Sequence, residues 1–342
     1  MSQTPRNPVT ISDVARAAGV STASVSSVIN GRSRVSAATT ARINAAIEEL
    51  GYQINPTARM LRSGRTGAIG LVVPELNRPY FGQLATHLAD ELAATGRHLV
   101  VQRSGGSREQ ELAAASFARL RMYDGVIFSV VDLDAQELER LGFSTPVVLI
   151  GERSAEHRFD HVAMDNVGGS AQATRHLLER GARRIVLLGG DVHSGIDMTQ
   201  LRTRGYTSAL AERGLAVDVD LVVPLGVFDL EAGRSTVHSL VERGVEFDAV
   251  FAVTDVVALG ALRGLAERGL RAPQDVQVIG FDNITEAAYS TPALTTVDPN
   301  KRDIARTALA LLDERLNPGT AEIAPREITV DASLVVREST LP

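Results

Sequence analysis

TISDVARAAGVSTASVSSVING (residues 10–31) has the apolar spacing of two short amphipathic helices in succession. This spacing predicts how the N-terminal part of the chain folds. Thr10 followed three residues later by Asp13 fits an N-terminal capping box. Gly19 ends the helix, whose apolar face is formed by Ile11, Val14, Ala15 and Ala18. The spacing therefore predicts a first helix over residues 11–18.

A second helix begins where Ser21 can cap it and ends at Gly31. Val25, Val28 and Ile29 recur at i, i+3 and i+4 and form its inward face. Two short helices joined across AGVS make a helix-turn-helix. The positions that would face outward are Thr22, Ala23, Ser26, Ser27 and Asn30.

A third helix begins after Ser36, which can cap it, and ends at Gly51. Its inward positions supply the core that the helix pair needs: Ile43, Ala46, Ile47 and Leu50. Any small three-helix bundle shows such a pattern, so the helices alone do not fix DNA binding.

Charge separates this N-terminal segment from the rest of the chain. Residues 1–65 contain eight arginines and three acidic residues, a formal charge of +5. Because the whole chain carries −6, the remaining residues carry −11. A basic head on an acidic body indicates a polyanionic partner for the head, although a chance excess of arginine gives the same balance.

The chain of 342 residues contains no cysteine, which excludes disulfides, thiolate catalysis and Cys-ligated zinc and fits a reducing cytosol. Its first residues lack the basic flank and apolar run of a signal peptide. No stretch reaches the roughly 18 uninterrupted apolar residues of a membrane span. We therefore expect a cytoplasmic protein that does not contact membranes.

From residue 68 onward, apolar runs rich in Val, Ile and Leu alternate with amphipathic helical stretches. Such runs are typical of parallel sheets that are buried on both faces. Eight are evident: IGLVVP, HLVVQRS, DGVIFSV, PVVLIG, RIVLLGG, LVVPLG, AVFAVTD and VQVIGF. They predict an α/β body of two doubly wound lobes, with a break near HVAMDNVGG, between Asp160 and Gly169.

Ligands of such folds bind beyond the carboxyl ends of the strands, and a cleft between two lobes gathers these ends from both sides. The residues that follow the expected strands form a mostly polar set: Pro74, Glu75, Arg103, Ser104, Ser129, Gly190, Asp191, Phe228, Thr254, Asp255, Asp282 and Asn283. Together with the rings of Tyr80 and Phe81, this set suits a sugar. Carboxylates and Arg bond hydroxyls, and ring faces cover apolar C–H patches.

Each of these candidates also has a purely structural interpretation. Asp255 can cap a helix that starts at Val256, and Tyr80 and Phe81 can belong to the core. Asp282 can pair with Arg202 in an empty cleft.

TISDVARAAGVSTASVSSVINGRSRVSAATTARINAAIEELGYQINPTARMLRSGRTGAIGLVVPELNRPYF (residues 10–81) resembles the lactose/galactose-repressor family of bacterial transcription regulators, and the likeness continues to the C-terminus. The resemblance implies a positioning helix over residues 10–18, a recognition helix in the major groove over 21–30, and a hinge helix over 55–63. DNA contacts are then expected from Thr10, Ser21, Thr22, Ala23, Ser26, Ser27, Asn30, Ser36, Asn55, Ala58 and Leu61.

The hinge can also be argued from physical principles. Asn55 is a good N-cap and Pro56 suits the first helical position, but a helix ending near RSGR is shorter than the roughly 12–15 residues that an isolated helix needs. We expect it to fold only on DNA. In the family, paired hinges wedge Leu side chains into the minor groove, which assigns the wedge to Leu61 and a groove-facing position to Ala58. A plain interdomain linker is the alternative.

For the body, the resemblance assigns effector contacts to Tyr80, Phe81, Arg202, Phe228, Asp255 and Asp282, and the strand-end argument adds Ser129 and Thr254. The sequence departs from the family pattern at three of the positions considered. Ser27 replaces the usual Arg, Ile54 the usual Pro before the hinge, and Thr254 a common Asn.

We therefore expect a helix-turn-helix DNA-binding domain (1–54), a hinge helix and linker (55–66), and a core of two lobes like those of periplasmic binding proteins (67–342). The predicted lobes are approximately 67–164 with 284–326, and 165–283 with 327–342. The expected function is a sequence-specific transcriptional repressor whose affinity for operator DNA is controlled by a small molecule, such as a sugar, bound between the lobes. A homodimer, or a dimer of dimers, would read a near-palindromic operator.

Two other classes of protein are weighed against this one. A solute-binding protein for transport has the same two-lobed body, but it needs a signal peptide and has no use for a helix-turn-helix. A sugar-modifying enzyme needs an acid/base pair such as Asp255 and Asp282, and nothing in the sequence indicates perturbed pKa values there. Phosphate-loop, G-x-S-x-G and H-E-x-x-H motifs are absent and the seven His are dispersed, so we expect no catalysis, no cofactor and no metal.

Overall fold

The computed structural model divides the chain into two compact units, Met1–Thr66 and Gly67–Pro342. The structure describes residues 9–29, 35–52, 65–116, 122–141, 143, 145–153, 158–193, 197–317 and 324–341. None of the helices within these ranges combines the length and apolar character needed to cross a membrane.

The N-terminal unit contains the three expected helices, α1 (Ile11–Ala18), α2 (Thr22–Ile29) and α3 (Ala37–Leu50). The Asp13 carboxylate accepts hydrogen bonds from the Thr10 backbone amide (3.0 Å) and hydroxyl (2.7 Å), and Gly19 ends α1 at φ 64°. Val14, Val25 and Ile43, one from each helix, are fully buried at the centre of the bundle. Caps and apolar spacing thus confirm the helix-turn-helix with its third supporting helix.

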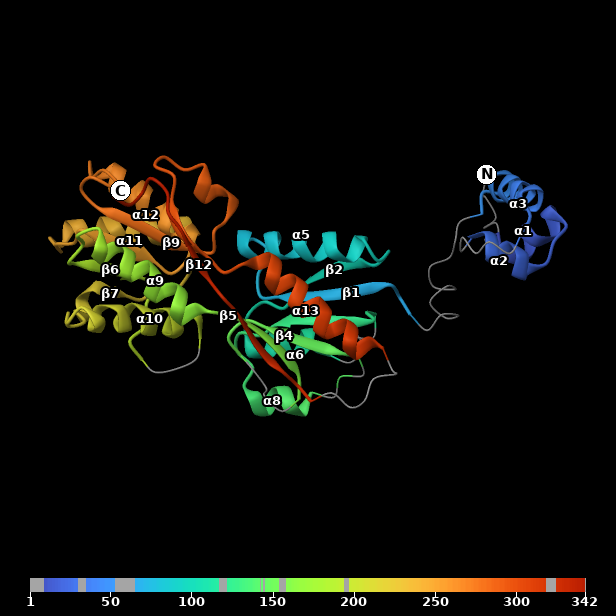
Figure 1. Ribbon diagram of the computed structural model, residues 1–342, viewed down its shortest axis with the longest axis horizontal. Helices are drawn as coiled ribbons and strands as arrows, with labels where there is room; N and C mark the ends of the chain where they lie inside the picture. Colours follow the sequence, from blue (N-terminus) through green and yellow to red (C-terminus); the bar gives the residue numbers. More distant parts are fainter. Residues whose placement is uncertain are drawn as a thin grey trace, which may run out of the picture. The chain divides into compact units, whose positions relative to one another are not determined.

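The C-terminal unit contains two six-stranded sheets (Figure 1). The first has the order β11-β5-β4-β3-β1-β2 and is entirely parallel; the second has the order β12-β10-β9-β8-β6-β7, and only β12 is antiparallel to its neighbour. The strands of the first sheet are β1 (Ala68–Val73), β2 (His98–Arg103), β3 (Gly125–Ser129), β4 (Val147–Ile150), β5 (Asp160–Met164) and β11 (Glu327–Val330). Those of the second are β6 (Ile185–Leu188), β7 (Val222–Val223), β8 (Ala249–Ala252), β9 (Gln277–Phe281), β10 (Thr295–Asp298) and β12 (Ser333–Val335).

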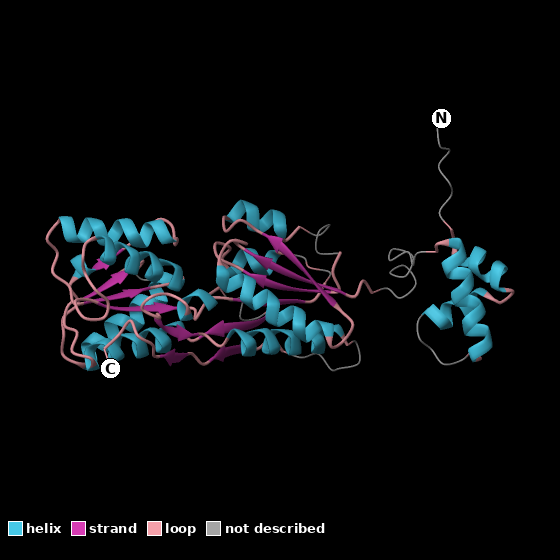
Figure 2. Cartoon of the chain, turned by 90° about the horizontal axis from the view of Figure 1, so that it is seen from above, coloured by secondary structure: helices cyan, strands magenta, loops and turns pink. Residues whose placement is uncertain are grey.

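Helices cover both faces of each sheet, as Figure 2 shows. In the first lobe, α5 (Pro79–Ala93) and α13 (Lys301–Leu316) pack on one face, and α6 (Arg108–Ala114) and α8 (Ala135–Arg140) on the other. In the second lobe, α11 (Leu230–Glu242) and α12 (Asp255–Glu267) pack opposite α9 (Asn166–Glu179) and α10 (Met198–Glu212). Central strands such as β3 and β8 are buried along their whole length because helices cover both sides, which explains their unbroken apolar runs.

The chain passes between the lobes three times: from β5 to α9, from β10 to α13, and from β11 to β12. The first passage lies where the break was predicted. The other two passages come later than the approximate positions 283/284 and 326/327, because β10 joins the second sheet beside β9 and β11 joins the first beside β5. β11 pairs with β5, which lies far away in the sequence, and neither of the short runs TTVD and EITV carries a local sign of the sheet that it joins.

Candidate functional site

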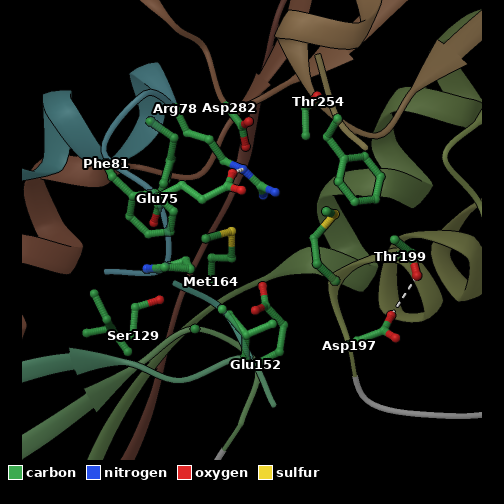
Figure 3. Close-up of a pocket in the computed structure, with 18 of the residues that line it drawn as sticks. Glu75, Arg78, Phe81, Ser129, Glu152, Met164, Asp197, Thr199, Thr254 and Asp282 are labelled. Carbon is green, nitrogen blue, oxygen red and sulfur yellow. Dashed lines mark hydrogen bonds and ion pairs between the residues drawn. The ribbon is translucent and has the colours of Figure 1, made fainter. Parts of the chain in front are cut away.

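A cavity of about 330 Å³ lies between the two lobes of the C-terminal unit (Figure 3). Strand ends and helix starts from both lobes line it, as expected for doubly wound sheets. Seven of the eight residues expected to contact an effector are on its wall: Tyr80, Phe81, Ser129, Arg202, Phe228, Thr254 and Asp282.

Arg202 is the most enclosed cation of this wall. It lies on α10 with 2% of its surface exposed, and its guanidinium stacks on the Phe281 ring, 3.6 Å from the centroid. Its Nε donates to Asn166 Oδ1 (2.8 Å) and its Nη1 to the Val253 carbonyl oxygen. Burial lowers the pKa of Arg202, and the nearby carboxylates of Asp282 and Glu152 oppose that shift. The guanidinium is therefore held in place by the protein, independently of a ligand.

Asp282 follows β9 and faces Arg202 across the end of the second sheet. Their closest atoms, Arg202 Nη2 and Asp282 Oδ1, are 3.5 Å apart. The pairing that the sequence left as an alternative is thus present, but it is long for a charge-assisted hydrogen bond. Burial raises the pKa of Asp282, while the cations of Arg202, Lys301 and Arg78 oppose the shift. The Asp282 carboxylate can therefore accept a further, shorter hydrogen bond from a ligand hydroxyl.

The aromatic residues of the first lobe serve both the core and the cavity. Tyr80 and Phe81 lie in the first turn of α5, with ring centroids 5.1 Å apart and planes at 76°. Both rings pack against the core beneath the first sheet and also line the cavity. The core and effector interpretations of these residues are therefore compatible.

Arg78, which directly precedes α5 in the first lobe, lines the cavity but was not predicted from the sequence. Its Nε donates to Glu75 Oε2 (2.5 Å), and its guanidinium carbon lies 5.5 Å from the centroid of the Phe228 ring in the second lobe. Further along α5, Gln83 donates from Nε2 to Thr285 Oγ1 of the second lobe (3.1 Å). The side chains of Gln83 in α5 and of Arg78 just before it thus both contact the opposite lobe.

Glu152 and Asp197 also line the cavity and were not singled out from the sequence. Glu152 comes two residues after β4 and accepts a hydrogen bond from Asn166 Nδ2 (3.1 Å). Asp197 caps α10 and accepts from Gln200 N and Thr199 Oγ1 (Figure 3). Since Glu152 follows a predicted strand, the strand-end argument could have found it; Asp197 follows no strand and gave no such signal.

Asp255 does not lie on the cavity wall, which corrects its predicted role as an effector contact. It is fully buried as the first residue of α12, and Thr254, not Asp255, caps the helix by accepting from Val257 N (3.3 Å). The Asp255 carboxyl accepts hydrogen bonds from Thr296 Oγ1 and from Ile284 N (2.8 Å). Burial raises the pKa of Asp255 well above its usual range, and the charge of Asp282 adds to this shift.

Several other residues after strands also lie away from the cavity wall: Arg103, Ser104, Gly190, Asp191 and Asn283. Arg103 and Ser104 lie at the end of β2, which is the edge strand of the first sheet. Of the described residues in the loop after β2, Gly105 and Gly106 line the cavity. The Asn283 side chain points to Asp298 Oδ2 and Arg337 Nη2 instead.

In the N-terminal unit, the candidate DNA-reading residues fall into three groups. Thr22 and Ala23 are exposed at the start of α2, whereas Ser26 and Ser27 are half-buried. The exposed residues Thr10, Ser21 and Ser36 each stand before a helix; Ser21 Oγ accepts from Ser24 N (3.1 Å) and Ser36 Oγ from Thr39 N (3.3 Å). Predicted contacts that lie outside the described residues are Asn30, Asn55, Ala58 and Leu61, and Ile54 lies there too.

Comparison with known proteins gives matches over both units. Residues 10–55 match the family of bacterial regulatory proteins, lacI family, and residues 174–340 match the periplasmic binding protein-like domain. The HTH-type transcriptional regulator CelR of Thermobifida fusca is 34% identical over an alignment of 346 positions, which covers 98% of this chain and 99% of that protein.

Two solved structures are similar along nearly the whole chain. The lac repressor dimer bound to operator and the anti-inducer ONPF superposes with a TM-score of 0.81 at 27% identity, covering 98% of this chain and 100% of that chain. A complex of the transcriptional regulator CelR with cellobiose gives a TM-score of 0.70 at 32% identity, covering 97% and 99%. The likeness therefore includes both the head and the two-lobed body.

Proposed function

This chain belongs to the lacI family of bacterial regulatory proteins, and from that premise we propose that it is a transcriptional repressor whose operator affinity is controlled by a sugar bound between its lobes. Like the family members that it matches, it is a sequence-specific DNA-binding regulator and not an enzyme. The effector assignment rests on Arg202 and Asp282, which lie 3.5 Å apart and both line the cavity between the two lobes.

The polar groups of the cavity suit a neutral, hydroxyl-rich ligand. Each cation on its wall already has protein partners: Arg78 binds Glu75, Arg153 donates to the Val131 carbonyl oxygen (2.9 Å), and Arg202 binds Asn166 and Val253. The carboxylates of Asp282 and Glu152 retain capacity to accept hydrogen bonds from ligand hydroxyls. The rings of Phe81 and Phe228 can cover the apolar faces of a sugar.

The size of the cavity and a solved relative also support a sugar. A volume of about 330 Å³ lies at the lower end of the roughly 300–1,000 Å³ found for ligand pockets, which suits a mono- or disaccharide. CelR, a relative of this chain, has been solved in complex with cellobiose.

We propose that the DNA-binding form is a homodimer, since the similar lac repressor binds its operator as a dimer; a dimer of dimers is the alternative. In this mechanism the sugar prefers one arrangement of the two lobes, and the lobe movement is passed to hinge segments that must pair on the DNA. Coupling of this kind requires that the effector bind one arrangement more tightly than the other.

The side chains of α2 suggest how this protein recognises bases. Thr22 and Ala23 offer methyl groups to thymine, while Ser26 and Ser27 can bond phosphates or base edges. No arginine lies on α2, so we propose that hinge insertion at Leu61 and DNA deformability supply much of the specificity.

Thermal unfolding in the presence of a sugar panel tests the effector assignment. We expect at least one neutral sugar among D-glucose, D-galactose, D-xylose, cellobiose and maltose to raise the Tm of the full chain, because a ligand of the folded state stabilises it by mass action. Glucose 6-phosphate and glucuronate serve as charged controls and should give no shift. Stabilisation by the charged sugars alone would contradict the assignment.

A further inference from the structure

Lys301 is the only lysine in the chain, and it is buried behind the cavity with 6% of its surface exposed. We propose that Lys301 is a positioning residue of the effector site: it holds the turn at Asp282 and Asn283 in the conformation that presents the Asp282 carboxylate to the cavity. The proposal rests on the proposed function only in so far as Asp282 binds the effector.

The turn that Lys301 contacts has an unusual backbone. Asp282 has φ 115° and Asn283 φ 45°, both in the positive region that residues with a side chain rarely adopt. Residues held in this region carry backbone strain, and they persist only where the surrounding structure holds them in place. The position of the Asp282 carboxylate therefore depends on the groups that fix this turn.

Lys301 fixes the two carbonyl groups of the turn. Its Nζ donates to the backbone oxygen of Asp282 and to that of Asn283, the latter at 3.1 Å. A compact ammonium with three donors can serve two adjacent carbonyl oxygens, whereas the flat fork of arginine matches a carboxylate or phosphate. Every other cationic side chain of the chain apart from histidine is an arginine, so Lys301 supplies the single ammonium group of the chain.

The amides of the turn are held from the other side, by residues of the second lobe. Asp282 N donates to the Val297 carbonyl oxygen (2.9 Å), Asn283 N to Thr296 Oγ1 (3.3 Å) and Ile284 N to Asp255 Oδ2 (2.8 Å). Asp255, fully buried behind the turn, thus shares the positioning task with Lys301.

Lys301 differs from these partners in the element that carries it. It is the first residue of α13, and α13 packs against α5 and the strands β3, β4 and β5 of the first lobe. A movement of the first lobe relative to the second must therefore either carry the Asp282–Asn283 turn along or break the two hydrogen bonds from Lys301. This contact links effector binding at Asp282 to the arrangement of the lobes.

Amide hydrogen exchange of the ligand-free full chain tests the positioning role. Lys301→Met keeps the aliphatic stem but removes both hydrogen bonds, so exchange at residues 282–284 should accelerate by roughly tenfold or more. Arg302→Met, which removes the neighbouring exposed cation of the same helix, is the matched control and should leave these rates unchanged. Equal exchange at 282–284 in the two variants would overturn the proposal.

The single lysine offers a second measurement that does not depend on a variant of Lys301. Labelling with [ε-¹³C]lysine gives the full chain one lysine signal, which should shift in Asp282→Asn and on addition of the sugar that raises the Tm. A signal that does not move in Asp282→Asn would overturn the proposal. If no sugar of the panel binds, the proposed effector class fails, whereas the exchange rates and the Asp282→Asn signal still decide the role of Lys301.

Discussion

Asp282→Asn is expected to weaken sugar binding by roughly tenfold to a hundredfold, because a hydrogen bond to a charged group contributes about 1.5–3 kcal/mol. The amide has the size of the carboxyl but offers one oxygen acceptor instead of two. Arg202 keeps its bonds to Asn166 and Val253, so we expect the fold to survive. The operator affinity of the sugar-free protein should stay within about twofold of the wild type, and the concentration of sugar needed to change it should rise with the loss in affinity.

Asp191→Asn is the matched control for this prediction. Asp191 follows β6 in the same lobe and bonds His193 and Gln200, but it lies away from the cavity wall. Calorimetric titration with the sugar that stabilises the wild type should give unchanged affinity in Asp191→Asn. Equal affinities for Asp282→Asn and the wild type would place the effector site elsewhere.

Removal of residues 1–66 is expected to abolish specific operator binding while leaving sugar binding intact. The fragment 67–342 corresponds to a compact unit with its own buried cores on both faces of each sheet. It loses all three helices of the bundle and eight arginines, and it carries a formal charge near −11 at neutral pH, which disfavours contact with DNA phosphates.

Operator affinity should therefore fall by about 10³-fold or more, the usual margin between specific and non-specific binding. Fluorescence anisotropy with a duplex selected from random-sequence DNA by the full chain measures this change. The same fragment should show the sugar-dependent rise in Tm of the full chain. Retained operator affinity in the fragment would contradict the assignment of DNA binding to the head.

Local signals in the sequence were sufficient for much of the fold. Helices α1 and α3 begin where their caps predicted, after Thr10 (with Asp13) and after Ser36. Caps can be recognised in the sequence because they act over only three or four residues. The eight apolar runs all correspond to strands. The central strands, such as β3 and β8, are buried along their whole length, which requires unbroken apolar sequence. The strands β5, β10, β11 and β12 were missed because their sequences are partly polar: DHVAM, TTVD, EITV and SLV.

The site was predictable in outline but not in detail. Residues after strands must gather at one edge of a parallel sheet, and this rule placed Ser129, Thr254 and Asp282 at the cavity. It cannot tell whether a carboxyl at such a point turns toward the cavity or inward, and Asp255 turns inward to hold the Ile284 amide. The rule could not predict Arg78, because its place at the cavity depends on its contact with Phe228 of the other lobe.

In the proposed mechanism, a sugar bound in the cavity changes the affinity of the head for DNA. An anisotropy titration of the labelled, selected duplex with the full chain, with and without a saturating amount of the stabilising sugar, measures this coupling. We predict that the operator Kd changes by roughly 5- to 150-fold, the usual range of allosteric coupling, and that Asp282→Asn at the same sugar concentration shows a smaller change. An operator Kd that stays the same while the sugar is shown to be bound would contradict the account.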